Sequence, residues 1–326
     1  MRHIITGGSG FTGTYLASAL IKQGEKPVIF DCREPRTPHG SADFIRGDTR
    51  EYRDVARLNL GADDIVYHLA ARQFHEGVPR QNRDEWFADV NVGGTRCLLK
   101  AMAAGSSQRL IFFSTDMTYG IPNSTPVSPL HPQRPIGPYG RSKLEAERLL
   151  TKAGQEFGLK ASIFRPRLIS GAGRLGILTK LFRLIRAGLP VPLIGAGKNR
   201  YQLIAVEDCV AAALAAVRRD CPSGPFNLGS DNPPTVKELL RELIRRAGSR
   251  SFLVSTPAAV LQPTLSFLDW IGLTLLYPEQ FAIANIDYIL NTATTKICLD
   301  WKPQRNDMDI IFDAYSEFTK SADAQS

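Results

Sequence analysis

The first 31 residues place a glycine-rich loop between a short apolar strand and a helix, and this arrangement strongly restricts the possible folds. The sequence predicts a strand over residues 3–5, a helix from about Phe11, and a second strand over 28–30 that ends on Asp31. The intervening glycines fit two overlapping patterns, GxGxxG and GxxGxxG. Such a unit is typical of parallel α/β sheets, because the loop must turn tightly and let the helix pack closely on the strand.

The same unit predicts a binding site for a dinucleotide. A glycine loop that opens a helix directs backbone N–H groups and the helix dipole at a pyrophosphate. The predicted cofactor-binding residues of the loop are Gly7, Gly10, Phe11, Thr12 and Gly13. Asp31 would accept hydrogen bonds from the adenosine ribose hydroxyls and repel a 2′-phosphate, which favours NAD over NADP. Arg33 lies two residues later and would weaken this preference.

Strand and helix patterns alternate through the first half of the chain. Further strands are predicted at 65–69, 110–113 and 161–164, and helices at 11–23, 86–104 and 143–157. Strands that are buried on both faces and separated by helices indicate a parallel sheet with right-handed crossovers. The fold class is therefore α/β, a doubly wound Rossmann sheet.

The regular alternation of strands and helices ends after about residue 167. From there, Gly- and Pro-rich connections join helical stretches at 178–187, 211–219 and 236–247. This change predicts a smaller, partly interleaved C-terminal domain. We assign 1–167 to the NAD-binding domain, with 191–220 returning to it. The substrate-binding domain would comprise 168–190 and 221–320, and 321–326 would form a frayed tail.

The charge and the cysteine content limit the classes of binding partner that we expect. The net charge is +8, but the basic residues are spread along the chain, so nucleic acid is not an expected partner. An anionic small molecule or a solvated basic surface would account for the charge equally well. The five cysteines show no metal-ligand spacing, so we expect reduced thiols, a cytoplasmic location and no metal site.

Residues 258–277 are mainly apolar, and the run is interrupted by Gln262, Pro263 and Asp269. The length suits a membrane span, but the proline and the aspartate argue against one. We expect a helical segment that covers the substrate side of the protein. The alternative is an apolar patch for a lipid-like substrate or for contact with a membrane surface.

The chemistry-bearing pattern is Tyr139-x-x-x-Lys143, which places both side chains on one face of a helix. A phenol that acts as a base at neutral pH needs its phenolate stabilised by about three pKa units, or roughly 4 kcal/mol. The Lys143 ammonium, an oxidised nicotinamide and the helix N-terminus could supply this together. A hydroxyl in the stretch 114–118, at the end of a central strand, could hydrogen-bond the substrate oxygen.

In their order and spacing these motifs resemble the extended short-chain dehydrogenase/reductases, and within them the NAD-dependent epimerase/dehydratase family. The resemblance extends through HLAA at 68–71, NVGGT at 91–95, FRP at 164–166 and GxGxxR at 195–200. It covers nearly the whole chain and implies a homodimeric enzyme that acts on a small molecule.

The resemblance implies roles for individual residues. Tyr139 matches the base, Lys143 its partner on the nicotinamide ribose, and Thr115 the group that hydrogen-bonds the reacting oxygen. The further cofactor-binding residues would be Asp48, Thr49, Leu69, Ala70, Ala71, Asn91, Ser114, Arg165 and Pro166. Arg200 matches an arginine that often holds the diphosphate of a nucleotide sugar.

Two departures narrow the activity. Asp116 matches the catalytic acid of the dehydratases, but Met117 replaces their basic glutamate, so dehydration is disfavoured. Leu168 stands where nucleotide-sugar enzymes of the family usually carry an asparagine, which removes one diphosphate contact. The predicted substrate-binding residues are Arg200, Leu168 and Met117.

The resulting prediction is an NAD-dependent epimerase that acts on a nucleotide-activated sugar through a transient keto intermediate. Two alternatives remain. Leu168 and the apolar segment 258–277 favour a dehydrogenase or reductase of a lipid or sterol-like secondary alcohol. A non-catalytic NAD-binding regulator is disfavoured, because Thr115, Tyr139 and Lys143 are all present.

Overall fold

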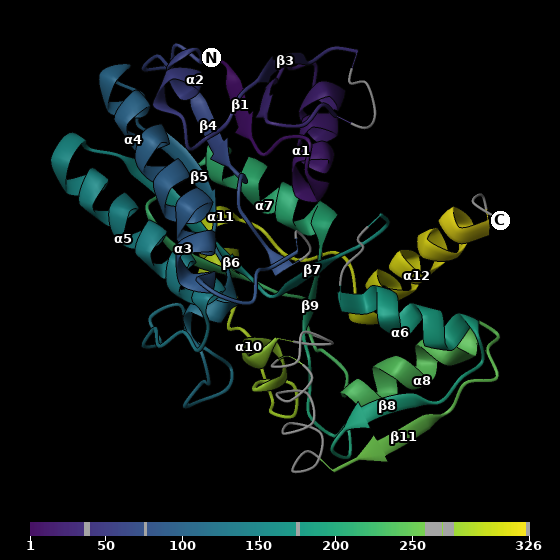
Figure 1. The fold of residues 1–326 in the computed structure, drawn as a ribbon. Coiled ribbons are helices and arrows are strands. Elements are labelled where there is room, and N and C mark those ends of the chain that lie inside the picture. The colour runs from purple at the N-terminus through teal and green to yellow at the C-terminus, as the bar shows by residue number, and fades with distance from the viewer. Residues whose placement is uncertain (36–39, 75–76, 174–176, 258–268, 270–276, 324–326) are drawn as a thin grey trace.

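The computed structural model describes residues 1–35, 40–74, 77–173, 177–257, 269 and 277–323. Its centre is a parallel sheet of seven strands in the order β10-β6-β5-β4-β1-β2-β3 (Figure 1). The strands are β1 (His3–Thr6), β2 (Val28–Asp31), β3 (Asp43–Arg46), β4 (Ile65–His68), β5 (Arg109–Phe113), β6 (Lys160–Pro166) and β10 (Gly224–Leu228). The strand order reverses beside β1, so the predicted doubly wound Rossmann sheet is confirmed.

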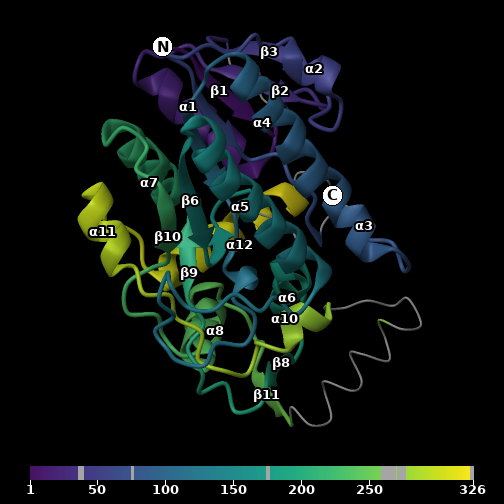
Figure 2. The ribbon, with the colours of Figure 1, turned by 90° about the vertical axis from the view of Figure 1, so that its left-hand side faces the viewer.

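Helices cover both faces of this sheet. One face carries α2 (Tyr52–Ala56), α4 (Thr95–Ala104) and α5 (Pro138–Phe157), and the other carries α1 (Phe11–Lys22), α7 (Val206–Arg218) and α11 (Ala293–Leu299). A π-helical stretch, Asp89–Gly94, joins α3 (Arg83–Ala88) to α4, and η3 (Asp116–Thr118) is a short 3₁₀ turn after β5. Figure 2 shows α11 beside β10, at the edge of the sheet.

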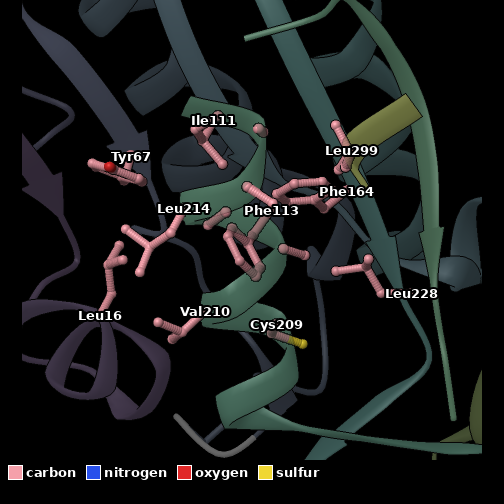
Figure 3. Packing of buried hydrophobic residues seen from close by; sticks show 14 of the residues in the cluster. Leu16, Tyr67, Ile111, Phe113, Phe164, Cys209, Val210, Leu214, Leu228 and Leu299 are labelled. Carbon is pink, nitrogen blue, oxygen red and sulfur yellow. The ribbon is translucent and has the colours of Figure 1, made fainter. Parts of the chain in front are cut away.

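The core on the α1 and α7 side explains why these strands are apolar throughout. Leu214 and Val210 of α7 pack with Leu16 of α1 against strand residues such as Tyr67 and Phe113 (Figure 3). Alternate strand residues point to the opposite face and pack under α4 and α5. Strands buried on both faces lack polar alternation, which is why the sequence shows continuous apolar runs.

A smaller lobe adjoins the carboxyl ends of the strands (Figure 1). It contains two short parallel pairs, β7 (Leu168–Ser170) with β9 (Leu203–Ala205) and β8 (Val191–Ile194) with β11 (Leu253–Thr256). Its helices are α6 (Ile177–Arg186), α8 (Val236–Arg246), α10 (Pro278–Phe281) and α12 (Asp307–Asp323). Phe182, Leu193, Leu243 and Tyr315 lie in its separate apolar core.

The structure departs from four predicted boundaries. The strand β10, within the segment predicted for the substrate domain, is the edge strand of the large sheet, whereas β8, within the predicted returning segment, pairs with β11. Residues 321–323 belong to α12 rather than to a frayed tail. Helix α5 begins at Pro138, five residues before the predicted start, so Tyr139 lies in its first turn.

Most of the apolar segment 258–277 lies outside the described residues, so its predicted helix and its possible lipid contact stay predictions. Among the helices that the structure describes, none combines the length and the apolar character needed to cross a membrane.

Candidate active site

The glycine loop between β1 and α1 lies against the residues that follow β4. Gly7 has φ +73°, and a Cβ atom built on it would stand 2.5 Å from the backbone nitrogen of Ala70. A Cβ on Gly13 would stand 2.5 Å from the carbonyl oxygen of Gly7. Both neighbours are backbone atoms that cannot give way, so only glycine fits at these positions. The predicted residues Leu69 and Ala70 thereby lie beside the loop that precedes Phe11 and Thr12, and Ala71 follows them in the chain.

Asp31 closes β2 next to this loop. Its two carboxylate oxygens accept hydrogen bonds from the backbone N–H groups of Ser9 (3.1 Å) and Arg33 (3.0 Å). The hydroxyl of Ser9 also donates to the carbonyl of Arg33 (2.7 Å). These contacts fix the carboxylate at the carboxyl end of β2, the edge at which open α/β sheets bind ligands.

The next acidic residue, Asp48, is paired with a neighbouring arginine. The Arg50 guanidinium donates to both Asp48 oxygens and also reaches Asp89. The hydrogen bonds from the Arg50 side chain hold the pKa of Asp48 below its usual range. Thr49 is buried against Gly94, so this turn is fixed to the start of α4.

Tyr139 lies in the first turn of α5 within a cluster of aromatic rings. Its ring is 5.3 Å from that of Phe74 and 5.7 Å from that of Phe87, centroid to centroid. The amide of Gln73 donates to the Tyr139 hydroxyl at 3.5 Å. The phenol is 6% exposed, so its hydroxyl lies in a largely water-excluded setting, where charges interact more strongly than in water.

Lys143 follows one helical turn later and is 2% exposed. Its ammonium lies 4.1 Å from the centroid of the Phe112 ring. Burial lowers the pKa of Lys143 to about 7, although the charge of Glu147 opposes this shift. A hydroxyl or an anion placed beside Lys143 would therefore change the fraction of the side chain that carries a proton near neutral pH.

A buried polar network links this helix to the glycine-loop side of the sheet. His68 shares hydrogen bonds with Thr6 (2.6 Å) and Thr95 (3.0 Å), and burial lowers its pKa to about 3, so the imidazole is neutral. Asn91 accepts from the backbone N–H of Arg72 (2.8 Å) and donates to Ser142 (2.9 Å). The predicted cofactor residue Asn91 thus uses its amide to join the β4 loop to α5.

Thr115 follows Ser114 just beyond the carboxyl end of β5. Its hydroxyl oxygen accepts from the backbone N–H of Met117 (3.2 Å) and donates to a carboxylate oxygen of Asp116 (3.2 Å). A Cβ on Gly140 would stand 2.6 Å from the carbonyl oxygen of Met117. The start of α5, which carries Tyr139, therefore packs directly on the turn that carries Thr115.

Asp116, which the sequence predicts to be catalytic, has its carboxylate buried among other residues of the chain. The carboxylate is 3% exposed and forms a short ion pair with Arg167. Its Oδ2 accepts from Arg167 and its Oδ1 accepts from Thr115, so both oxygens are engaged by residues of the chain. The catalytic role of Asp116 stays a prediction.

Two predicted cofactor-binding side chains instead meet on one buried acid, Glu147 of α5. The hydroxyl of Ser114 donates to it, and Arg165 donates to both of its oxygens. Arg165 also donates to the Tyr119 hydroxyl and to the carbonyl of Pro129, each at 2.9 Å. These side chains stabilise the packing of α5 on the sheet, and the predicted cofactor contacts of Ser114 and Arg165 stay predictions.

The predicted substrate-binding residues have different settings. Met117 is half-buried in η3. Leu168 begins β7 and packs partly buried against the core of the smaller lobe. Arg200 is paired with Asp287 at 2.9 Å, and about half of each side chain is exposed. Pro166 ends β6, in register with Leu228 of β10.

Two cavities border the α5 helix. One, of about 130 Å³, is lined by Phe74, Phe87, Tyr277, Glu279 and other residues, and lies beside the aromatic cluster around Tyr139. A larger one, of about 560 Å³, runs between α5 and the β6–β10 edge. Neither lining includes Thr115, Tyr139 or Lys143, and the smaller cavity is the one that borders the aromatic cluster around Tyr139.

Sequence reasoning missed three buried charged residues around the site. They are Glu147, Arg167 and Glu279. Glu279 is 4% exposed, its carboxylate faces the backbone N–H of Gly140 at 3.4 Å, and burial raises its pKa to about 7. A carboxylate at this end of α5 interacts favourably with the helix dipole. Glu147 stands four residues after Lys143, and this helical spacing could have indicated it; Glu279 carries no local pattern.

Comparison with known proteins places this geometry in a family. Residues 3–229 match the model of the NAD-dependent epimerase/dehydratase family. The chain is 28% identical over 96% of its length to an uncharacterized protein of Sinorhizobium fredii, of which it covers 77%. It is 27% identical over 96% of its length to a UDP-glucose 4-epimerase of Streptomyces lividans, of which it covers 95%.

A solved structure shows the same fold. It is the UDP-glucose 4-epimerase of Thermotoga maritima with UDP-glucose, which superposes with a TM-score of 0.79 at 24% identity over 99% of this chain and all of the other. Together with the family match, which spans more than two thirds of the sequence, this similarity leads to one conclusion. The chain belongs to the NAD-dependent epimerase/dehydratase family, and NAD is the cofactor of that family.

Proposed function

We propose that this protein is an epimerase of a nucleotide-activated sugar that works through a transient ketone. One observation carries the proposal. The turn bearing Thr115 packs on the first turn of α5, which presents Tyr139 and, one turn later, Lys143. A hydroxyl, a phenol and a buried ammonium in this arrangement are suited to moving the proton of a secondary alcohol.

The residues present fit NAD. The backbone approach at Gly7 and Gly13, the Asp31 carboxylate at the end of β2 and the buried Lys143 ammonium would hold the pyrophosphate, the adenosine ribose and the nicotinamide ribose, respectively. When bound, NAD supplies the reversible oxidation of the alcohol to a ketone.

The chain's own groups would handle the proton. Tyr139 would take the proton of the sugar hydroxyl as the alcohol is oxidised and return it when the ketone is reduced. The Lys143 ammonium would stabilise the phenolate form, because an opposite charge nearby favours the charged state of a titratable group. Thr115 would hydrogen-bond the reacting oxygen. Reduction of the ketone from its other face would give the epimer.

The relatives support the choice of substrate class. Both the Streptomyces lividans relative and the structural neighbour from Thermotoga maritima are UDP-glucose 4-epimerases. We therefore propose UDP-glucose as the substrate to test first. Met117 favours epimerisation over dehydration, because its thioether stands in place of the glutamate that acts as the base in the dehydratases.

The cofactor preference is the first prediction. We expect NAD to bind at least about tenfold more tightly than NADP, because Asp31 accepts hydrogen bonds from ribose hydroxyls and repels a phosphate. Isothermal titration of both dinucleotides with cofactor-free protein measures this ratio. Asp31→Asn should reduce the preference for NAD over NADP, because it removes the repulsion between the carboxylate and the 2′-phosphate. Asp43→Asn changes an exposed carboxylate that begins β3 and should leave this preference unchanged. Equal binding of both dinucleotides by the wild type would show that the attraction of the 2′-phosphate by Arg33 offsets its repulsion by Asp31.

The second prediction concerns the diphosphate. We propose that the half-exposed guanidinium of Arg200 exchanges Asp287 for the diphosphate of the substrate, because an arginine can donate two parallel hydrogen bonds to phosphate oxygens. Free UDP should then raise the melting temperature of the NAD-loaded protein by a few degrees, and Arg200→Ala should remove most of this shift.

The control for this prediction is Arg245→Ala. Arg245 is also an exposed arginine paired with a carboxylate, that of Glu242, but it lies on α8. The Arg245→Ala variant should show the same rise in melting temperature with UDP as the wild type. An equal UDP shift in Arg200→Ala and wild type would remove Arg200 from the substrate site, and stabilisation by a sterol or detergent instead of any nucleotide would favour the lipid-alcohol alternative.

A further inference from the structure

The first turn of α5 is capped by a side chain from a distant part of the sequence. Gly137 stands at the N-cap position and has no side chain, and Pro138 at the first helical position has no N–H group. The next N–H groups of this turn belong to Tyr139 and Gly140. A side chain at the N-cap commonly accepts hydrogen bonds from these two helical positions. In α5 the carboxylate of Glu279, from α10, takes the place of that side chain.

The contact between Glu279 and this turn is close and buried. The backbone N–H of Gly140 donates to Oε2 of Glu279 at 3.4 Å, and the glutamate is 4% exposed. The backbone N–H of Tyr139 also stabilises the ionised carboxylate. A Cβ atom built on Gly137 would stand 2.3 Å from Cδ of Glu279 and 2.5 and 2.6 Å from its two oxygens. The absence of a side chain on Gly137 is therefore what lets the carboxylate approach the helix.

The segment that carries Glu279 also packs on the aromatic cluster around Tyr139. The ring of Tyr277, just before α10, stacks on Phe74 with centroids 4.8 Å apart, and Phe74 contacts Tyr139. The side-chain oxygen of Gln280 accepts from the backbone N–H of Tyr277 (3.1 Å), which fixes the start of α10. Because α10 belongs to the smaller lobe and α5 packs on the large sheet, Glu279 joins the two lobes at the turn that carries Tyr139.

We propose that Glu279 is a positioning residue that caps α5 from the smaller lobe and thereby holds Tyr139 in its reactive orientation. Helix ends fray where their N–H groups lack partners, and Tyr139 lies in such a terminal turn. A phenol that exchanges a proton with a substrate hydroxyl must be held within hydrogen-bond reach of it. The inference rests on the proposed function for the role of Tyr139, whereas the cap itself can be tested without substrate.

Stability alone does not account for a glutamate at this position. Burial raises the pKa of Glu279 to about 7, although the N–H groups of Gly140 and Tyr139 and the charge of Arg141 oppose this shift. The other charged groups that face it are Asp84 and Arg83 of α3. The folded protein thus binds this proton more tightly than the unfolded chain does. The contribution of Glu279 to the free energy of unfolding therefore rises as the pH falls from about 7 to about 4.5, and its ionisation at neutral pH costs stability.

The activity test compares two substitutions of Glu279 in the epimerisation of UDP-glucose. Glu279→Ala removes the cap, and we expect kcat to fall about tenfold, as for a small misplacement of a reacting group. The dissociation constant of NAD should stay largely unchanged, because the pyrophosphate site lies in the loop between β1 and α1. Glu279→Gln keeps an oxygen that accepts from the same N–H groups and should recover most of kcat. A purely structural role would lower the stability of Glu279→Ala and leave kcat of the folded protein unchanged, and that result would overturn the proposal.

Gly137→Ala tests the same contact from the α5 side. Gly137 has φ −120°, which alanine adopts without strain, so the added methyl group acts mainly by displacing the carboxylate of Glu279. Urea unfolding of Gly137→Ala, Glu279→Ala and the double variant measures the coupling between the two sites. We expect Gly137→Ala to be more destabilising in the wild type than in Glu279→Ala, where no carboxylate remains to be displaced. Equal effects in both backgrounds would contradict the cap.

A spectroscopic arm reports on Tyr139 itself and needs no substrate. Fluorotyrosine in place of Tyr139 gives a fluorine NMR signal that is sensitive to the surroundings of the ring. We expect one narrow line in the NAD-loaded protein, the same line in Glu279→Gln, and a shifted or broadened line in Glu279→Ala. An unchanged line in Glu279→Ala would overturn the proposal. If the wild type does not convert UDP-glucose, the proposed function fails, while this spectrum still decides whether Glu279 positions Tyr139.

Asp208→Ala is the matched control for Glu279→Ala in both measurements. Asp208 is also a buried carboxylate, 2% exposed, and it accepts from two backbone N–H groups, those of Gln304 (2.9 Å) and Arg305 (3.2 Å). Its loss should lower stability but leave kcat and the fluorine signal of Tyr139 at their wild-type values. The same loss of kcat in Asp208→Ala as in Glu279→Ala would show that destabilisation alone lowers turnover, and would also overturn the proposal.

Discussion

Tyr139→Phe is expected to lower epimerase turnover by about 10²–10⁴-fold, the range typical of a lost acid–base group. The substitution removes only the ionisable oxygen and keeps the ring, which packs against Phe74 and Phe87. The fold and the binding of NAD should therefore persist. Initial rates with UDP-glucose and NAD titration of the same preparation measure both effects.

Tyr15→Phe is the matched control for this prediction. Tyr15 is a partly buried tyrosine on α1 whose hydroxyl donates to the carbonyl of Ala172 at 2.9 Å. Its loss should cost at most a modest amount of stability, about 1 kcal/mol, with turnover near the wild-type value. Near-normal turnover by Tyr139→Phe would remove Tyr139 from the mechanism and leave the proton transfer unassigned.

Gly13→Ala is expected to weaken NAD binding by about 10- to 10²-fold. The added Cβ would stand 2.5 Å from the carbonyl oxygen of Gly7 and 2.6 Å from Cα of Gly8. Because both contacts are to backbone, the loop must move away from α1, and such overpacking costs about 1–3 kcal/mol. A displaced loop no longer directs its N–H groups at the pyrophosphate.

Gly40→Ala is the control, since a Cβ there meets no atom of the described residues within 4 Å. It should bind NAD as tightly as wild type does. The dissociation constants of the two variants, compared with the wild-type value, test the glycine-loop assignment. Unchanged binding in Gly13→Ala would mean that the pyrophosphate lies elsewhere.

The fold could be predicted in some detail because its signals are local. Continuous apolar runs, a glycine loop and helical periodicity are each readable over a few residues, and they specified the Rossmann sheet. The edge strand β10 was missed because Gly224–Leu228 is short and begins with glycine and proline. Its place in the sheet depends on pairing with β6, which lies about 60 residues earlier.

The sequence indicated which residues form the candidate site, but it did not show how all of their side chains are oriented. The pattern from Tyr139 to Lys143 fixed both residues on one face of α5. The sequence could not show that Arg165 and Ser114 turn towards Glu147, or that Arg167 neutralises Asp116. These contacts join β5, α5 and the segment after β6, and such long-range pairs leave no spacing pattern. The homodimer and the cytoplasmic location stay predictions.

The most direct test of the proposed function is whether the purified protein interconverts UDP-glucose and UDP-galactose. Proton NMR of the anomeric signals, started separately from each nucleotide sugar, follows the reaction without a coupling enzyme, and absorbance at 340 nm reports any net reduction of NAD. The account predicts that both reactions reach the same equilibrium mixture, without stoichiometric accumulation of NADH and with almost no conversion by Tyr139→Phe. Stoichiometric NADH with no epimer formed, or no conversion in either direction, would contradict it.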